Sequence, residues 1–178
     1  MNTKESSAGE YSVEYECVVE LSHANAWEKL RDISMADQYV PGLTGLEVTT
    51  AQVEGVGASR RVYQGTRLVL DETVVDWREG EGFALRLHRG DKGPVPPMTE
   101  AFFEYGLRQR DGRVYLHNRM RYRLGLGFLG KWLNTLAIGK VVRGAVRDTT
   151  LAQKLFYESG HRVTKDALVA AKREINRN

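Results

Sequence analysis

One long amphipathic stretch, from Phe128 to Glu158, constrains this chain more than any other feature of its 178 residues. It contains no proline, and its apolar residues recur with the three- and four-residue spacing of one helix face. Those apolar positions are Leu129, Leu133, Leu136, Val141, Ala145, Ala152 and Leu155, widened by Trp132, Val142, Val146 and Phe156. At ~1.5 Å per residue such a helix spans about 45 Å, so a whole sheet is needed to cover its buried side. Gly160 is the predicted stop, because glycine tolerates the left-handed conformation just past a helix end.

Two glycines, Gly139 and Gly144, interrupt this predicted helix. Each costs up to about 1 kcal/mol relative to alanine, so each calls for a physical reason. One interpretation is close packing or a kink. The other is that small residues leave room for a molecule between helix and sheet. We favour the first.

Bulk composition and charge narrow the class of protein. Hydrophobic residues make up 42% and charged residues 28%, which is typical of a soluble globular chain and argues against disorder. The net charge of +3 is too small to predict a nucleic-acid partner. Cys17, the single cysteine, excludes an intrachain disulfide and is interpreted as a core thiol rather than a nucleophile. The scattered histidines predict no metal site, and we expect no cofactor. Without a signal-like segment or membrane span, we expect a cytoplasmic protein.

Alternating apolar and polar residues upstream of the long helix predict seven strands. In the first, Val13, Tyr15 and Cys17 alternate with acidic residues, as in a half-buried strand. The predicted strands are Tyr11–Leu21, Leu43–Thr50, Ala58–Gln64, Arg67–Trp77, Phe83–Arg89, Met98–Arg108 and Arg113–Leu124. Two short helices, over residues 24–31 and 35–39, fall between the first two strands.

The dipeptide Asp111-Gly112 is the strongest hairpin signal in the chain. A two-residue turn there places Glu104 opposite Arg119, and it places apolar residues opposite one another on the other face. Such pairs are what cross-strand energetics favour. Arg119 and its neighbours Arg121 and Arg123 are therefore expected on an ion-paired outer face.

These elements predict an α+β fold. A curved antiparallel seven-stranded sheet wraps around a long C-terminal helix, with two short helices after the first strand. Residues 1–10 are expected to be a disordered lead, residues 11–158 a single domain, and residues 159–178 a helical tail. Leu168 and Ile175 lie on one side of that tail, which is expected to dock on the body or on a partner.

Four short segments in fixed order carry a family resemblance. They are residues 24–30 with Trp27, residues 55–62, residues 72–77 leading to residues 83–85, and residues 125–129 opening the last helix. Their order and spacing over residues 11–158 resemble the helix-grip superfamily called SRPBCC, or START-like, and within it the polyketide cyclase/dehydrase branch. The resemblance implies a deep apolar cavity between sheet and helix, holding a small hydrophobic or amphipathic molecule such as a lipid, quinone, sterol or polyketide. The superfamily includes carriers, receptors and a few aromatase/cyclase enzymes, so the fold alone does not fix the activity.

Strand alternation predicts which side chains line this cavity. If the turn at Gly80-Glu81 keeps the alternation in phase, Glu72 and Asp76 share the inner face with Leu85, whereas a bulge would turn Glu72 outward. The predicted ligand-binding residues are Tyr15, Cys17, Glu72, Leu85, Leu87, Met98, Phe103, Tyr105, Asn118, Met120, Tyr122, Phe128, Trp132, Leu136 and Gly139. An apolar wall with a few polar groups is typical of small-molecule sites.

Glu72 has three interpretations. The favoured one makes it an outer-face partner of Arg60 or Arg61, and another makes it a buried structural acid. In the third it is a buried carboxylate with a raised pKa that acts as general acid or base. In that enzymatic case Glu72, Tyr105 and Tyr122 are the predicted catalytic residues.

Two further features have alternative interpretations. Tyr105 and Asn118 lie opposite each other in the predicted hairpin, and they hydrogen-bond either each other or a ligand. The proline-rich segment 90–97, with Met98 and Phe128 nearby, is either a lid at the open end of the cavity or a plain connecting loop. We favour the connecting loop.

Three functions follow, in this order. The first is a carrier or sensor of a small hydrophobic ligand. The second is a cofactor-independent polyketide cyclase/dehydratase, and the third is a protein-interaction module acting through residues 159–178. We expect no nucleic acid and no stable membrane insertion. Peripheral membrane contact, and the choice between monomer and homodimer, are left open.

Overall fold

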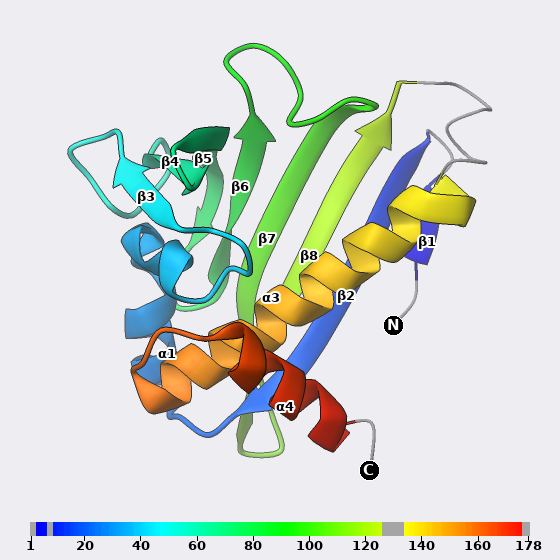
Figure 1. Cartoon of the computed structure of the whole chain (residues 1–178). Coiled ribbons are helices and arrows are strands. Elements are labelled where there is room, and N and C mark those ends of the chain that lie inside the picture. The colour runs from blue at the N-terminus through cyan, green and yellow to red at the C-terminus, as the bar shows by residue number, and fades with distance from the viewer. Residues whose placement is uncertain (1–2, 7–8, 126–133, 176–178) are drawn as a thin grey trace.

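An antiparallel sheet wraps one long helix in the computed structural model of this protein, which describes residues 3–6, 9–125 and 134–175 (Figure 1). Within these residues the sheet has eight strands, in the spatial order β1-β2-β8-β7-β6-β5-β4-β3. In chain order the strands are β1 (Thr3–Ser6), β2 (Glu10–Val19), β3 (Gly45–Val48), β4 (Ser59–Gln64), β5 (Arg67–Arg78), β6 (Gly82–His88), β7 (Met98–Arg110) and β8 (Arg113–Leu124). The helices are α1 (His23–Leu30), η1 (Ile33–Gln38), η2 (Asn134–Ile138), α3 (Gly139–Ser159) and α4 (Lys165–Ile175).

All seven predicted strands are present, and the predicted α+β helix-grip architecture is confirmed. Strand β1 is an addition. The sequence predicted a disordered lead over residues 1–10, but Thr3–Ser6 pair with β2 in antiparallel fashion, with Thr3 opposite Val13. That part of the prediction was wrong. The segment is too short and polar to show an alternation, yet its backbone pairs with the otherwise free edge of β2.

The hairpin between β7 and β8 has the register that its turn residues predicted. Asp111 and Gly112 both have positive φ, 51° and 73°, as both central residues of a type I′ hairpin turn do. Glu104 lies opposite Arg119. Its carboxylate accepts hydrogen bonds from Arg119 Nε at 2.8 Å and from Arg121 Nε at 2.5 Å, so the predicted ion pairing of the outer face is confirmed for these two arginines.

A bulge in β5 changes the face of one predicted residue. The pairing of β5 with β6 shifts between Val74 and Asp76. Glu72 stays opposite Leu87 on the inner face, but Asp76 falls on the other face and is exposed. The expectation that Asp76 faces inward was therefore wrong. The sequence does not reveal which residue is the extra one in this bulge. Val74 and Val75 are consecutive valines, and either would suit a buried position.

The long C-terminal helix ends where the sequence predicted. Gly160 adopts a left-handed φ of 73°, and its N–H donates to the carbonyl of Phe156, as at many helix ends. The predicted start at Phe128 lies outside the described residues. Within them, the helix begins as the π-helical turn η2 and continues as α3.

The buried face of α3 differs from the predicted stripe. Val141 is 71% exposed and Ala145 is exposed as well, whereas Val142 and Val146, assigned to the edge of the stripe, are buried. The buried positions of α3 are Gly139, Val142, Val146, Thr149, Thr150, Leu151, Ala152, Gln153 and Tyr157. Three of these are polar, so the apolar pattern alone gave the wrong centre for the face.

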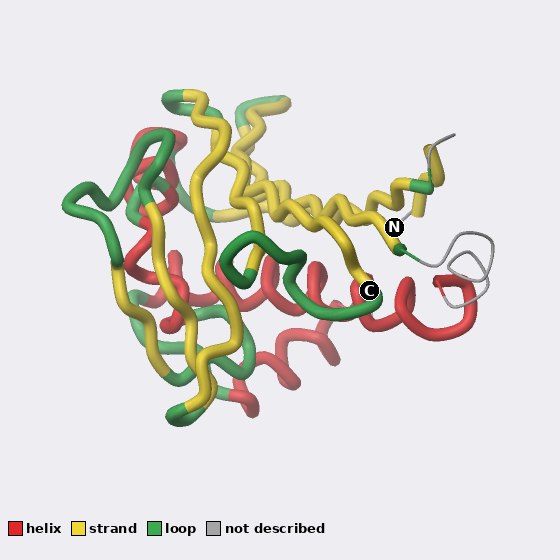
Figure 2. Tube along the Cα trace, turned by 90° about the horizontal axis from the view of Figure 1, so that it is seen from above, coloured by secondary structure: helices red, strands yellow, loops and turns green. Residues whose placement is uncertain are grey.

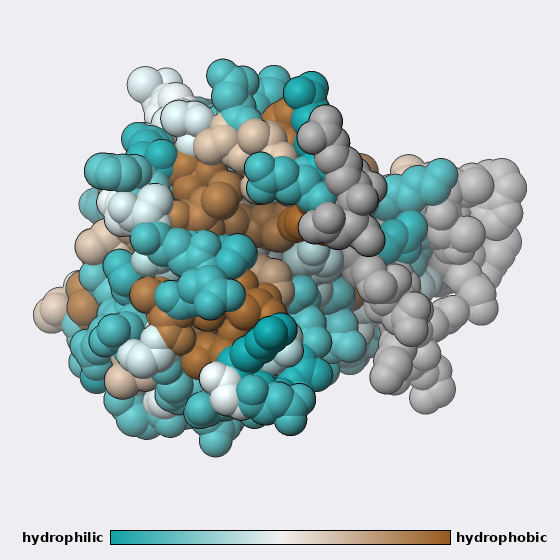
Figure 3. Space-filling view, turned by 90° about the horizontal axis from the view of Figure 1, so that it is seen from below, coloured by the Kyte–Doolittle hydropathy of each residue, from teal (hydrophilic) through white to brown (hydrophobic). Residues whose placement is uncertain are grey.

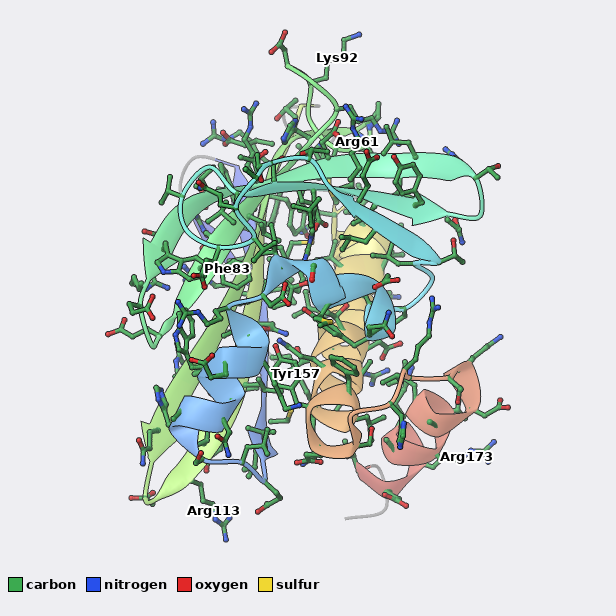
Figure 4. The ribbon with its side chains drawn as sticks, turned by 90° about the vertical axis from the view of Figure 1, so that its left-hand side faces the viewer. Arg61, Phe83, Lys92, Arg113, Tyr157 and Arg173 are labelled. Carbon is green, nitrogen blue, oxygen red and sulfur yellow. The ribbon has the colours of Figure 1, made fainter. Side chains whose placement is uncertain are left out.

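Helix α3 lies across the concave side of the curved sheet and packs on β2 and β8 (Figures 1 and 2). Helix α1 contacts β7. Aromatic rings fill the interior near the C-terminal end of α3, and these rings belong to Tyr39, Trp77, Phe83, Tyr105, Phe156 and Tyr157. Figure 4 shows Tyr157 between α3 and the first two helices, and Phe83 on the sheet behind α1. This end of the interior is therefore rich in aromatic side chains.

The C-terminal tail folds back onto the body through α4. The N–H of Val163 donates to the carbonyl of Gln38 at 2.9 Å, and Lys172 pairs with Asp148 at 2.7 Å. Leu168 is buried against the body. Of the two expectations for the tail, the structure shows docking on the body. No helix in the described part of the chain has the length and hydropathy needed to cross a membrane.

Candidate functional site

The predicted wall residues on the strands come together on the inner face of the sheet. Tyr15 lies opposite Asn118, which in turn lies opposite Tyr105. Phe103 lies opposite Met120. The predicted wall on β2, β6, β7 and β8 consists of Tyr15, Cys17, Leu85, Leu87, Phe103, Tyr105, Asn118, Met120 and Tyr122, all buried or half-buried. The sheet therefore presents one continuous and mainly apolar inner surface.

Asn118 is fully buried and binds the long helix rather than Tyr105. Its Nδ2 donates to Thr150 Oγ1 at 3.1 Å and to Gln153 Oε1 at 2.8 Å. Gln153 Nε2 donates in turn to the hydroxyl of Tyr157 at 3.0 Å. Asn118 Oδ1 has no hydrogen-bond partner among the described residues. This neutral network fastens β8 to α3, and the predicted Tyr105–Asn118 hydrogen bond is not formed.

A second polar group in the inner wall is the ion pair between Arg60 and Glu72. Arg60 is 1% exposed, its Nε donates to Glu72 Oε2 at 2.5 Å, and its Nη1 donates to the carbonyl of Ile33. Burial lowers the pKa of Arg60, but the Glu72 carboxylate more than offsets this and the pKa lies above its usual value. Glu72 thus has the partner that we favoured, but on the inner face rather than the outer one.

The partial exposure of Glu72 distinguishes this pair from the Asn118 network. The Glu72 side chain is 14% exposed. Among the described residues, only Arg60 donates to its carboxylate. A carboxylate is a strong acceptor, so Glu72 presents a partly accessible acceptor within an apolar wall.

The hydroxyls of Tyr39 and Tyr105 complete the cluster around Arg60. The two rings meet edge to face, with centroids 6.5 Å apart. Burial raises the pKa of Tyr39 to about 12 and the pKa of Tyr105 well above its usual value, with Arg60 partly opposing both shifts. Both hydroxyls therefore stay protonated at neutral pH, and each has a proton available for a hydrogen bond.

Tyr122 belongs to a different part of the interior. Its hydroxyl donates to Asn134 Oδ1 at 2.5 Å, and its ring stacks on Tyr11 with centroids 5.5 Å apart. Burial raises the pKa of Tyr122 to about 12. The three predicted catalytic residues are thus divided, because Glu72 and Tyr105 share the Arg60 cluster while Tyr122 binds η2.

Cys17 has the properties of a core thiol. Its Sγ lies 3.8 Å from the carbonyl oxygen of Thr150, and burial raises the thiol pKa to about 12. Since the thiolate is the nucleophilic form, the thiol is unreactive at neutral pH. Within the described residues, no group of three or more histidine, cysteine or acidic side chains could hold a metal ion.

The two helix glycines have different surroundings. A Cβ at Gly139 would lie 2.8 Å from the carbonyl oxygen of Asn134, whereas nothing lies within 4 Å of a Cβ at Gly144. At Gly139 the helix passes from π-helical to α-helical geometry. The interpretation as close packing or a kink therefore applies to Gly139, and neither environment indicates space reserved for a ligand.

The proline-rich segment 90–97 lies beside the end of β8. The N–H of Gly125 donates to the carbonyl of Pro97 at 3.0 Å, and Met98 is half-buried. Whether the segment acts as a lid stays a prediction. Three predicted ligand contacts lie outside the described residues or side chains, namely Phe128, Trp132 and Leu136.

Sequence reasoning missed the inner positions of Arg60, Tyr39 and Gln153. A signal existed for Arg60, because it lies two residues from Val62 and so shares the face of that buried side chain. No comparable signal existed for Gln153, since a polar residue in an amphipathic helix is ordinarily assigned to solvent.

Neither a protein-family model nor a curated protein matches this sequence, but solved structures match its fold. Ara h 8.0201 is 13% identical with a TM-score of 0.56, over 84% of this chain and 98% of that one. A protein from Thermobifida fusca is 18% identical with a TM-score of 0.63, over 82% and 92% of the two chains. DynU16, from the dynemicin biosynthetic locus, is 17% identical with a TM-score of 0.58, over 85% of this chain and 48% of that one. These identities carry the fold and nothing finer: the chain has the helix-grip fold, as the resemblance of its sequence implied.

Proposed function

We propose that the protein binds a small, mainly apolar molecule carrying a hydrogen-bond donor, against the inner face of its sheet. The observation that carries this proposal is the Glu72 carboxylate, which is paired with buried Arg60 while 14% of its side chain stays exposed. The fold supports the same conclusion, because helix-grip proteins typically bind hydrophobic ligands.

Stability alone does not account for the Arg60–Glu72 pair. Replacing a buried ion pair by well-packed hydrophobic residues is often neutral or stabilising, since desolvation offsets the attraction between the charges. A ligand that supplies a hydroxyl or amine proton to the Glu72 carboxylate forms a charge-assisted hydrogen bond, so binding gives the pair a purpose.

The surroundings of Glu72 define the rest of the ligand. Leu87 lies directly opposite Glu72, and both Leu87 and Phe103 keep about a tenth of their surface accessible, 9% each. An apolar ring or chain packs against these two side chains while its donor meets Glu72. No proton transfer is required, so the role is that of a carrier or sensor.

A matched pair of probes tests this chemistry. 2-Naphthol and 2-methoxynaphthalene have the same ring system, but only the first has a donor. We expect 2-naphthol to bind more tightly, and Glu72→Gln to weaken it by about fivefold, since a hydrogen bond to a charged group is worth roughly 1 kcal/mol more than a neutral one. Glu100→Gln, at an exposed position of β7, is the control. Equal binding of both probes, or an unchanged affinity in Glu72→Gln, would contradict the proposal.

The natural ligand is sought separately. Native mass spectrometry of the purified protein is expected to show a co-purifying molecule, lost on organic extraction. A protein that carries no such molecule, and whose melting temperature no lipid, quinone, sterol or polyketide raises, does not have this function.

The enzyme alternative has one observation in its favour. Glu72 and Tyr105 both adjoin Arg60, so a proton acceptor and a hydroxyl donor lie together, as a polyketide cyclase/dehydratase reaction requires. In that case Glu72 transfers the proton and Tyr105 orients a carbonyl. Glu72→Gln with unchanged turnover of a poly-β-ketone substrate would eliminate this role.

A further inference from the structure

Helix α4 creates a groove on the outside of the molecule, away from the inner wall of the sheet. The groove lies between the segment 37–43, α3 and the start of α4, and its volume is about 540 Å³. Small-molecule sites usually measure ~300–1,000 Å³. Its walls are joined, because Arg162 donates to the carbonyl of Leu43 at 3.2 Å and Val163 N–H donates to that of Gln38 at 2.9 Å.

The floor of this groove is apolar. Val40 and Leu43 form one side, and Leu168 and Val169 of α4 form the other, with Ala152 of α3 beneath. Leu168 is buried, but Val169 is exposed. Apolar surface bordered by hydrophilic residues is visible on the underside of the molecule (Figure 3). The apolar part of a ligand can therefore pack against the floor of the groove.

The charges around the groove favour an anion at the start of α4. Lys172 is paired with Asp148 at 2.7 Å. Lys165 has no acidic partner within the described chain, and Arg162 donates only to a backbone carbonyl. Both cations adjoin the N-terminus of α4, whose dipole also favours negative charge. Asp37 lines the groove as well, and its carboxylate weakens this preference without cancelling two cations.

We propose that this groove is a second binding site, for a small amphipathic anion. The anionic head pairs with Lys165 and Arg162, and the apolar tail lies along Val40, Leu168 and Val169. The proposal does not rest on the interior function: Tyr39 borders the groove, but Glu72, Leu87 and Phe103 do not line it. Its failure would leave the interior proposal untouched.

Sodium octanoate and 1-octanol are the probes for this site, with backbone amide chemical shifts of the full chain as the measurement. Octanoate is expected to shift the amides of residues 37–43 and 162–172, with an apparent affinity that falls as salt concentration rises. Octanol is expected to bind the same residues about fivefold more weakly, since exposed charge pairs contribute up to about 1 kcal/mol.

Two pairs of variants locate the tail and the head. Val169→Trp places a large side chain in the groove and is expected to abolish octanoate binding, whereas Ala170→Trp, exposed on the same helix and outside the lining, leaves it unchanged. Lys165→Gln is expected to weaken octanoate about fivefold and to leave octanol unaffected. Arg173→Gln, at an exposed position outside the lining, is the charge control.

Three results would overturn the proposal. One is the absence of octanoate-dependent shifts in residues 37–43 and 162–172 of the unaltered protein. Another is an octanoate affinity that is the same in Val169→Trp as in Ala170→Trp. The third is a change of the same amides with protein concentration alone, which would show that a second copy of the chain occupies the groove. The first and third measurements need no variant, so they hold even if Val169→Trp does not fold.

Discussion

Two polar clusters in the described part of the interior differ in a way that separates a structural role from a binding role. The first, built on Asn118 and Gln153, is neutral and joins β8 to α3. The second, built on Arg60 and Glu72, is charged and lies on the part of the sheet toward β4 and β5. Asn118 is 0% exposed, although its Oδ1 has no partner among the described residues, whereas the Glu72 side chain is 14% exposed. A polar group indicates a ligand only where a molecule can reach it.

The largest effect is expected from breaking the charged cluster. Arg60→Met leaves the carboxylate of Glu72 buried without its partner, at a cost of about 3–5 kcal/mol in the free energy of unfolding. The double variant Arg60→Met/Glu72→Leu is expected to recover most of this loss, since it removes both charges. Urea denaturation measures both. A single variant as stable as the double one would show that the pair is not buried in solution.

A smaller loss is expected from the neutral cluster. Asn118→Ala removes the donors to Thr150 and Gln153 and leaves two buried acceptors unpaired, at about 2 kcal/mol. Because Asn118 Oδ1 is inaccessible, affinity for 2-naphthol is expected to stay within about twofold of the original, less than one hydrogen bond is worth. A loss of affinity as large as that in Glu72→Gln would place Asn118 in the binding site and erase the contrast.

The ion pairs of Glu104 on the outer face of the sheet can be compared with the two interior clusters through the pH dependence of stability. Burial alone would raise the pKa of Glu104, but hydrogen bonds from Arg119 and Arg121 outweigh it and the pKa is lowered. A carboxyl with a lowered folded pKa stabilises the protein above its unfolded pKa, about 4.3, and the stabilisation is lost as pH falls through the folded value. Glu104→Gln is therefore expected to cost about 1 kcal/mol at pH 7. That difference is expected to shrink below pH ~4. A difference that is constant from pH 7 to pH 3 would contradict the ion pairing.

The smallest change in stability is expected from the helix glycines, which lie outside both polar clusters. Gly144→Ala is expected to raise the free energy of unfolding by about 0.5–1 kcal/mol, because its Cβ meets nothing within 4 Å and alanine favours the helix. Neither polar cluster is altered. Gly139→Ala, whose Cβ would meet the Asn134 carbonyl, is expected to have the opposite sign. Thermal unfolding of the two variants under one condition makes the comparison, and stabilisation by both would be inconsistent with the π-to-α junction at Gly139.

The sequence predicted the hairpin of β7 and β8 better than the helix packed beside it. Turn residues and cross-strand charges both specify register locally, so Glu104 opposite Arg119 could be derived on paper. The buried face of α3 depends instead on hydrogen bonds to a distant strand. Thr150 and Gln153 face inward because Asn118 meets them there, and no local pattern carries that information.

The candidate site was partly predictable for the same reason. Period-two alternation placed Glu72 with Leu85 and Leu87 correctly, since the bulge lies beyond it toward the turn. The same bulge places Asp76 on the outer face, opposite to the face that the alternation predicted. Tyr39 belongs to the loop after η1, and its approach to Tyr105 and Arg60 depends on how the whole domain closes, so no strand or helix period predicts it.

The left-handed turn at Gly160 has a consequence for the evolution and engineering of this protein. A residue with a side chain adopts this backbone conformation at a cost of roughly 1 kcal/mol, so one substitution would favour a straighter exit from α3. Residues 161–175 would then be held against the body only by their own contacts, such as those of Val163 with Gln38 and of Lys172 with Asp148. Residue 160 is therefore the natural place to measure how much this reversal of chain direction adds to those contacts.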